Sequence, residues 1–220
     1  MNPVKRPRVK ICCIGSVEEA LMAINYGASA VGLVSDMPSG PGVIPEELIA
    51  EIAATIPPGV SSFLLTSKQD VQSIIAQQKS TRVNTIQICD QFKGDYSDLR
   101  DALPGISLVQ VIHVTGEASI GEAVEVASHV DGLLLDSGNQ VLPVKELGGT
   151  GRVHDWSISR KIREIVRKPV FLAGGLNPEN IRDAVEQVSP FGVDVCSGVR
   201  TGNVLDEDKL LRFFNAVKSA

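Results

Sequence analysis

The chain has 220 residues, of which 43% are hydrophobic and 21% are charged, a balance typical of a soluble globular protein. Its formal net charge of −5 argues against nucleic acid or an anionic membrane surface as a partner, because both need a basic face. An anionic small molecule is still compatible with this charge, since backbone amides can hold a phosphate without any net positive charge.

The first strand and helix show a pattern that repeats along the chain. Residues 9–14 form an apolar run, and Ser16 and Glu19 follow with the spacing of a helix-capping box. Apolar residues then recur at helical spacing as far as Gly27, where a helix should stop. Further on, Pro45 stands where a first-turn proline would open the second helix.

The same alternation continues to the end of the chain. Apolar runs that predict strands fall at residues 30–34, 62–65, 85–89, 108–112, 133–136, 170–173 and 193–196. Helical spacing follows at residues 71–75, 158–166, 181–188 and 210–217. Asn177 and Pro178 have the types expected for the cap and first residue of the third of these helices. The segment 96–103 is short and weak as a helix.

Eight β runs, each followed by a helical or helix-sized segment, predict a parallel sheet of the α/β class. Short, buried strands fit a barrel with helices outside. A doubly wound open sheet is the competing architecture, because alternation alone does not show closure. Eight units in 220 residues favour the barrel, and no linker divides the chain, so we expect a single (β/α)8 TIM barrel over residues 1–220.

Nothing in the sequence predicts secretion or membrane insertion. No apolar segment follows the basic residues near the N-terminus, and no stretch approaches the roughly 18 apolar residues of a membrane helix. The four cysteines, Cys12, Cys13, Cys89 and Cys196, form neither a CxxC pair nor a metal-finger spacing. Scattered thiols favour a reducing compartment, so we expect a cytoplasmic protein.

The strand parity of the cysteines raises the question of a metal. Cys12, Cys89 and Cys196 share inward parity with Asp194, and three thiolates with a carboxylate can bind zinc. The fourth strand lies across the barrel from the first and eighth, too far for an unforced site, so we expect neither a metal nor a cofactor. Cys13 is one residue out of phase, and we expect it to point to the outer helices as part of the core.

The most informative motifs lie at the carboxyl ends of the strands, where barrels of this kind carry their chemistry. They are K-I-C-C-I at 10–14, L-D at 135–136, G-G-T-G at 148–151, D-W at 155–156, A-G-G-L-N-P-E-N at 173–180 and V-D-V-C-S-G-V at 193–199. Together they resemble the phosphoribosylanthranilate isomerase family of tryptophan biosynthesis. That family carries K-I-C-G-I-T, L-D, G-G-S/T-G, F-D-W, G-G-L-N-P-E-N-V and V-D-V-S-S-G-V-E in this order.

The resemblance spans residues 9–200 and implies an aldose–ketose isomerase, an intramolecular oxidoreductase. The family converts N-(5-phosphoribosyl)anthranilate to 1-(o-carboxyphenylamino)-1-deoxyribulose 5-phosphate by an Amadori rearrangement. A general acid protonates the ribose ring oxygen, the ring opens to a Schiff base, and a base removes the C2′ proton. Position by position, the resemblance makes Cys12 the base and Asp136 the acid, and Asp194 would hold a sugar hydroxyl.

Physical chemistry is compatible with these roles. An acid and a base must flank one small sugar within hydrogen-bond reach, and a thiolate can act as the base in a cationic setting. Lys10 lies two residues before Cys12 on the same strand face and would provide that setting. A purely structural role is also open to each of these residues. A lone strand cysteine is often a small buried hydrophobe, and an aspartate at a strand end often caps a helix.

The glycine-rich loops predict a phosphate site. Glycines let backbone N–H groups approach an anion, and the loops after the seventh and eighth strands are a common phosphate location in barrels. The substrate-binding residues expected on this basis are Gly149, Gly174, Gly175, Ser197 and Gly198. The alternative is that these residues only shape tight turns. The expected partner is a small phosphorylated sugar, bound by a monomer or a homodimer.

Departures from the family pattern concern the end of the site that would meet the anthranilate group. The family has an arginine in S-P-R-Y-V-S-P-E that meets the carboxylate, whereas residues 39–46 here read S-G-P-G-V-I-P-E. Pro41 or Gly42 therefore takes the place of that arginine, and neither can form a charge-assisted contact. The family's Q-L-H-G reads Q-I-C-D at residues 87–90, so Cys89 replaces a histidine.

These changes leave two interpretations open. A compensating cation could come from Arg152, His154 or Arg200, although a solvated surface role is open to each of them. Otherwise the chain is a diverged barrel that isomerises, or merely binds, another phosphorylated sugar amine. Retention of both Cys12 and Asp136 argues against a protein that only binds.

Overall fold

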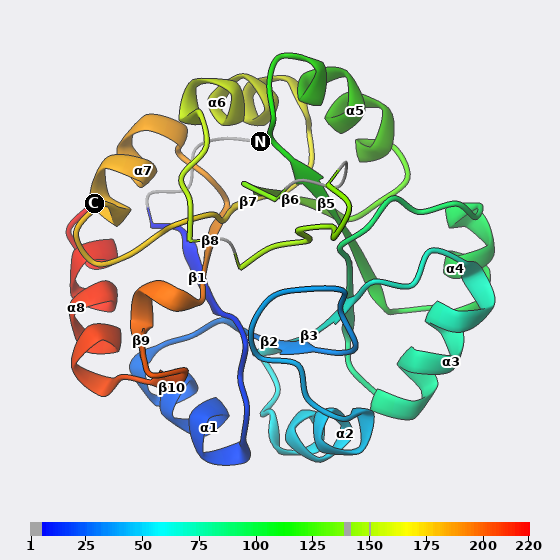
Figure 1. Ribbon diagram of the computed structural model, residues 1–220, viewed down its shortest axis with the longest axis horizontal. Coiled ribbons are helices and arrows are strands. Elements are labelled where there is room, and N and C mark those ends of the chain that lie inside the picture. Colours follow the sequence, from blue (N-terminus) through cyan, green and yellow to red (C-terminus); the bar gives the residue numbers. More distant parts are fainter. Residues whose placement is uncertain (1–5, 139–141, 150) are drawn as a thin grey trace.

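The computed structural model describes residues 6–138, 142–149 and 151–220. Eight parallel strands close into a barrel in chain order, with β8 hydrogen-bonded to β1 (Figure 1). The strands are β1 (Arg8–Ile11), β2 (Ala30–Val34), β3 (Ser61–Thr66), β4 (Thr85–Ile88), β5 (Ser107–His113), β6 (Gly132–Asp136), β7 (Val170–Leu172) and β8 (Gly192–Val195). Closure confirms the predicted TIM barrel and excludes the open doubly wound sheet.

The helices form an outer ring around the strands (Figure 1). They are α1 (Val17–Tyr26), α2 (Glu46–Thr55), α3 (Val71–Thr81), α4 (Tyr96–Ala102), α5 (Ala118–Ala127), α6 (Trp156–Ile165), α7 (Ile181–Val188) and α8 (Glu207–Lys218). A short helix η1 (Ser197–Val199) and a hairpin of β9 (Arg200–Thr201) and β10 (Val204–Leu205) separate β8 from α8. Within the described part of the chain, no helix has the length and apolar content needed to cross a membrane.

Strand alternation divides the core into two layers. Side chains of one parity, such as Ile11, Leu33 and Leu64, pack between the strands and the helices. Side chains of the other parity fill the barrel, where the rings of Phe63 and Phe171 meet edge to face with centroids 5.9 Å apart. Because the inward parity includes the last residues of several strands, the same alternation that fills the barrel also brings polar side chains to its carboxyl end.

Helix starts lie close to the predicted positions, but Pro45 precedes α2 rather than standing in its first turn, and α7 starts later than its cap. Ser16 Oγ accepts the N–H of Glu19, as the capping-box spacing predicts, and α1 ends at Gly27 in the left-handed conformation. Asn177 Oδ1 accepts the N–H groups of Glu179 and Asn180, both at 3.0 Å, but regular helix α7 starts only at Ile181. The cap is therefore present, and a turn stands between it and the helix.

The weak segment 96–103 proves to be a helix. Asp95 precedes α4, and its carboxylate accepts the backbone N–H of Ser97 at 2.8 Å. The helix places Leu99 in the core with no exposed surface. A single buried anchor in two turns gives little periodicity, so the cap and the packing stabilise a helix that the apolar pattern alone does not predict.

Candidate active site

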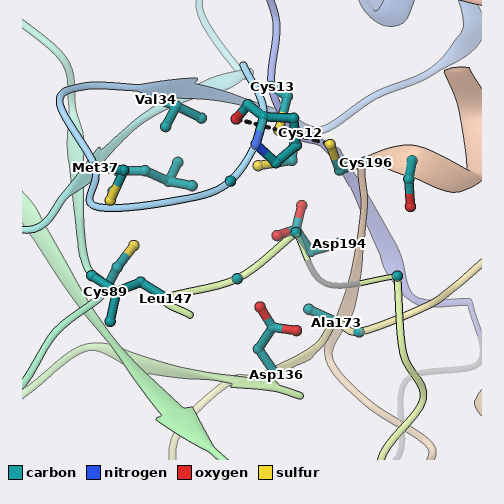
Figure 2. Close-up of a pocket in the computed structure, with 18 of the residues that line it drawn as sticks. Cys12, Cys13, Val34, Met37, Cys89, Asp136, Leu147, Ala173, Asp194 and Cys196 are labelled. Atoms are coloured by element: carbon teal, nitrogen blue, oxygen red, sulfur yellow. Dashed lines mark hydrogen bonds between the residues drawn. The ribbon is translucent and has the colours of Figure 1, made fainter. Parts of the chain in front are cut away.

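A cavity that is partly open to solvent lies at the carboxyl ends of the strands (Figure 2). Most of the residues expected from the sequence line it: Cys12, Asp136, Gly149, Gly174, Gly175, Asp194 and Ser197. In Figure 2, Cys12 and Asp136 approach the cavity from opposite sides, with Asp194 between them. The eight-stranded barrel thus brings together side chains that are separated by more than a hundred residues in the chain.

Lys10 and Asp194 form a buried ion pair next to the cavity. They are register partners on β1 and β8, and Lys10 Nζ donates to Asp194 Oδ2 at 2.8 Å. Burial alone would lower the pKa of Lys10, but the charge of Asp194 and the hydrogen bond to it raise this pKa above the ordinary value. Asp194 Oδ1 has no hydrogen-bond partner within the described residues, so it can accept a hydroxyl from a bound ligand.

Cys12 lies just past the end of β1, next to the Lys10 ammonium. Its backbone N–H donates to Val195 O at 2.8 Å, which continues the β1–β8 pairing by one residue. Gly32 on the neighbouring strand leaves the space for both side chains, because a Cβ atom placed there would lie 2.9 Å from Cys12 Sγ and 3.0 Å from Lys10 Nζ. The positive charge beside the thiol is the setting in which a thiolate can act as a base.

Asp136 ends β6 and is almost completely buried. Its Oδ1 accepts the N–H of Ser137 at 2.7 Å. Burial raises the pKa of Asp136, and the hydrogen bond from Ser137 and the nearby His113 only partly oppose it. A carboxyl with a raised pKa keeps its proton to a higher pH than an ordinary aspartate, which suits a general acid.

Two glycines keep the other faces of Asp136 clear. A Cβ atom on Gly148 would lie 2.8 Å from Oδ2, and one on Gly174 would lie 3.2 Å from Oδ1. Gly174 also has a φ of 84°, which side-chain-bearing residues rarely adopt. The two glycines therefore leave room for a substrate atom to approach the carboxyl.

The loop after β7 and the start of η1 form the glycine-rich side of the cavity. Gly175 has a φ of 63°, and a Cβ atom on it would lie 2.8 Å from the backbone of Arg152. Ser197 lines the cavity, but Gly198 does not. Gly198 packs directly behind it, where a Cβ atom would fall 2.0 Å from Leu176 O. Thr150, in the middle of the G-G-T-G motif, lies outside the described residues.

Cys13 does not point to the outer helices, so the prediction from strand alternation is wrong. Strand β1 ends at Ile11, and Cys13 has a φ of 60°, in the left-handed region. The alternation of an extended strand therefore no longer applies to it. Its thiol faces the cavity, with Sγ 2.7 Å from Cys196 Sγ and 3.6 Å from Pro41 O (Figure 2).

Arg200 is neither a surface residue nor a cavity residue. Its buried guanidinium pairs with Glu19 at 2.8 Å and donates to the carbonyl of Cys13 at 2.5 Å. It therefore joins the segment after β8 to the turn between β1 and α1. The hypothesis that it supplies a cation for a substrate carboxylate is not compatible with this position.

The other two candidate cations also lie outside the cavity lining. His154 hydrogen-bonds with Ser159, and burial lowers its pKa to about 4, so it is neutral near pH 7. Arg152 pairs with Glu146. No lysine, arginine or histidine is among the described residues that line the cavity.

Apolar side chains line part of the cavity, and sequence reasoning did not predict them as a group. This apolar wall consists of Val34, Met37, Pro41, Leu65 and Leu147, with Cys89 beside them. Figure 2 shows Val34, Met37, Leu147 and Cys89 on one side of the cavity. Burial raises the pKa of Cys89 to about 12, so this thiol stays neutral and adds to the apolar character. Met37 and Leu147 come from loops without periodicity, which explains why no pattern identified them.

Comparison with known proteins agrees with this geometry. The family described as N-(5'phosphoribosyl)anthranilate (PRA) isomerase matches residues 9–216. N-(5'-phosphoribosyl)anthranilate isomerase 2 of Methanosarcina mazei is 38% identical, over 96% of this chain and 94% of that protein. The isomerase of Haloferax volcanii is 35% identical, over 97% and 94% respectively.

Solved structures give the same result. The phosphoribosyl anthranilate isomerase of Thermotoga maritima superimposes with a TM-score of 0.80 and 30% identity, covering 97% of this chain and all of the other. A second isomerase structure holds reduced 1-(o-carboxyphenylamino)-1-deoxyribulose 5-phosphate, with a TM-score of 0.77 and 28% identity over 97% of this chain and all of that one. With a buried acid and a cysteine facing one cavity of a closed barrel, this chain belongs to the N-(5'-phosphoribosyl)anthranilate isomerase family.

Proposed function

We propose that this protein catalyses the isomerisation of N-(5'-phosphoribosyl)anthranilate, an Amadori rearrangement in tryptophan biosynthesis, and that it does so in the cytoplasm. The observation that carries the proposal is the pairing of an acid with a raised pKa, Asp136, and a cysteine beside a buried ammonium, Cys12, in one cavity. Membership of the family supports the reaction, and the cavity supports the residue roles.

Each step has a candidate group in the cavity. Asp136 donates its proton to the ribose ring oxygen as the C1′–O bond breaks, and the amine lone pair forms the C=N bond of a Schiff base. The Cys12 thiolate then removes the C2′ proton, and the resulting enolamine tautomerises to the ketose amine. Asp194 Oδ1 accepts a sugar hydroxyl, while Lys10 holds the other carboxylate oxygen in place. Because the two reacting groups lie on opposite sides of the cavity, they can act on one small sugar without meeting each other.

The phosphate is proposed to bind on the glycine-rich side. Backbone N–H groups of the loops containing Gly149, Gly174 and Gly175 and of the turn at Ser197 would hold it, which agrees with the open space and positive φ angles there. A crystal soaked in inorganic phosphate should show the ion between the β7–α7 loop and η1. An empty or side-chain-filled position would refute this assignment.

Turnover with phosphoribosylanthranilate, followed by chromatographic separation of substrate and product, tests the function. Cys12→Ser and Asp136→Asn should each lower kcat by about 10²-fold or more, the usual scale for losing a positioned acid or base. Binding of the product should change less, because the phosphate contacts lie elsewhere. Full turnover in either variant would remove that residue from its role.

A second candidate is an isomerase for another phosphorylated sugar amine, one without a carboxylate on its aromatic or alkyl group. The described residues that line the cavity include no cation, and the apolar wall stands where a carboxylate would need one. Comparing kcat/KM for phosphoribosylanthranilate and phosphoribosylaniline separates the two candidates. A clear preference for the aniline compound favours the second, and a clear preference for the anthranilate compound excludes it.

A further inference from the structure

Two thiols meet at the edge of the cavity without taking part in the proposed reaction. Cys13 and Cys196 follow the ends of the neighbouring strands β1 and β8, and both line the cavity (Figure 2). Their sulfur atoms are 2.7 Å apart, and both cysteines are free. A disulfide bond is ~2.05 Å long, so the bond could form with a displacement of only about 0.7 Å.

Neither thiol is part of the pattern by which the chain resembles its family. Cys13 stands at the glycine of K-I-C-G-I-T, and Cys196 stands at the first serine of V-D-V-S-S-G-V-E. Cys13 also adopts a φ of 60°, a conformation that suits glycine better than cysteine. Placing a cysteine at position 13 therefore costs conformational free energy, and the proposed isomerase reaction does not explain why a cysteine stands there.

The surroundings of the two sulfur atoms make them unequal. Hydrogen bonds with Cys12 and Cys196, together with burial, raise the pKa of Cys13, so this thiol keeps its proton. The hydrogen bond with Cys13 lowers the pKa of Cys196, and the charge of Arg200 lowers it further against the effect of burial. Cys196 is also the more exposed of the two. It is thus the thiol expected to react first.

We propose that Cys196 and Cys13 form a thiol–disulfide exchange site for low-molecular-weight disulfides, distinct from Cys12. The Cys196 thiolate attacks one sulfur of a disulfide R–S–S–R, so that the old S–S bond breaks, a Cys196–S–R bond forms and RS⁻ leaves. Cys13 then gives up its proton to the released thiolate and attacks Cys196 Sγ, which expels the second RS⁻. In sum, one small disulfide is reduced to two thiols, and the cysteine pair loses two protons and two electrons.

The second step has a consequence for the cavity. A mixed disulfide on Cys196 places the R group in the space that a substrate would occupy. When the Cys13–Cys196 bond forms, the R group leaves and the space is free again. Cys13 acts as the resolving thiol that clears the cavity.

The test exposes the folded protein to 2-hydroxyethyl disulfide, quenches free thiols with iodoacetamide and maps the products by mass spectrometry. We expect a mass loss of two hydrogen atoms and a cross-linked peptide pair, with fragmentation between Cys12 and Cys13 assigning the bond to Cys13. Cys89 provides the internal reference, because it is buried and its pKa is raised to about 12. Cys196 should react at least about tenfold faster than Cys89, since the thiolate is the attacking species.

Variants separate the two steps. Cys13→Gly, which suits the positive φ, should accumulate a stable 2-hydroxyethylthio group on Cys196. Cys196→Ser should give neither an adduct on Cys13 nor a cross-link. Cys89→Ser, a matched thiol-to-hydroxyl control, should still form the Cys13–Cys196 cross-link. A bond that joins Cys12 to either partner, or the absence of any bond in the unmodified chain, would overturn the proposal. The mapping of the unmodified chain decides the question even where a variant does not fold.

Discussion

Gly32 shows how much the chemistry of the site depends on a residue that has no side chain. It lies within β2, where its backbone needs no unusual conformation, so its importance is purely steric. The missing Cβ provides the space in which the Lys10 ammonium and the Cys12 thiol come together. Protein interiors are tightly packed, and even one methyl group here would displace the Cys12 thiol or the Lys10 ammonium.

Gly32→Ala should therefore damage catalysis more than stability. The added Cβ would lie 2.9 Å from Cys12 Sγ, and moving the thiol should reduce kcat by about tenfold or more. Overpacking should cost about 1–3 kcal/mol of unfolding free energy. Gly121→Ala in α5, where a Cβ atom meets nothing within 4 Å, is the matched control and should keep full turnover. Unchanged turnover in Gly32→Ala would show that the thiol is not held where the proposed mechanism needs it.

Asp136 gives a prediction about pH. Its pKa is raised on folding above the unfolded value of about 3.9, because burial disfavours the charged form. A group of this kind contributes stability that is fully present below the unfolded pKa and is lost as pH rises through the folded pKa. Asp136→Asn removes this loss, so the stability of the unmodified protein relative to the variant should fall as pH rises from about 4 through the raised folded pKa.

Urea unfolding of both proteins at a series of pH values provides the measurement. Asp101→Asn, at an exposed position of α4, controls for the change in net charge. A difference in stability between the unmodified chain and Asp136→Asn that does not change with pH would contradict the raised pKa. If Asp136 is the general acid that we propose, its ionisation should also set the alkaline limit of activity, because a general acid must hold its proton.

The two cysteines at the end of β1 mark what sequence can and cannot predict at the scale of residues. The shared parity of Cys12, Cys89, Cys196 and Asp194 follows from strand alternation, and all four line the cavity. Cys13 does not follow this rule, because the strand stops before it and its φ is positive. No periodicity reports where hydrogen bonding between strands ends, so its contact with Cys196 was not predictable.

At the scale of elements, the segment after β8 depends on one buried ion pair. Arg200 begins β9 and reaches back to Glu19 on α1, while its guanidinium also donates to the carbonyl of Cys13. Glu19 in turn accepts the backbone N–H groups of Gly15 and Leu205. Sequence alone identified Glu19 only as a capping-box residue, because the partner is 181 residues away.

Arg200→Met should destabilise the protein through Glu19. Removing one partner of a buried pair typically costs about 3–5 kcal/mol. Burial opposes ionisation of Glu19, but the hydrogen bonds from Arg200 and from the backbone leave its pKa lowered. The stabilisation by this carboxylate is present above its unfolded pKa of about 4.3 and is lost as pH falls through the lower folded value.

The loss caused by Arg200→Met should therefore be large near pH 7 and should shrink near pH 3. Denaturant unfolding at the two pH values measures it. Arg212→Met serves as the control. It removes an exposed pair between Arg212 on α8 and Glu179 in the turn before α7, and it should cost about 1 kcal/mol or less. An equal loss at both pH values would mean that Arg200 acts through packing alone.

At the scale of the whole molecule, barrel closure was predictable and the apolar side of the cavity was not. A closed barrel is predicted from the eight strand–helix units in the sequence, and this prediction does not depend on the conformation of any loop. The apolar side depends on contacts between the loops after β2 and β6, such as Ser39 Oγ to Lys145 O at 2.7 Å. Pro41 packs so closely on the second loop that a Cβ atom on Gly149 would lie 2.6 Å from its Cδ. Loop-to-loop contacts of this kind leave no trace in strand or helix periodicity.

These contacts decide where a missing cation can be restored. Pro41 lines the cavity, so an arginine there can reach a ligand, whereas Gly42 has a φ of 79° and a Cβ atom on it would lie 2.5 Å from Cys13 Cβ. A charge-assisted contact with the anthranilate carboxylate is worth about 1.5–3 kcal/mol, or roughly 10- to 150-fold in affinity. We expect the unmodified protein to have a high KM for phosphoribosylanthranilate. Pro41→Arg should lower this KM, and Gly42→Arg should lose activity.

Two comparisons test whether the lower KM comes from the charge of the added arginine. Pro41→Gln removes the proline without adding a cation, so it should not reproduce the gain, and phosphoribosylaniline, which lacks the carboxylate, should gain nothing from Pro41→Arg. Steady-state kinetics on the three proteins with both compounds provides the measurement. A KM in the low micromolar range for the unmodified chain would mean that it binds the carboxylate by another route. Since Arg200 is held by Glu19 and none of the described lining residues is basic, that route would have to use backbone amides or a closing of the loop that carries Pro41.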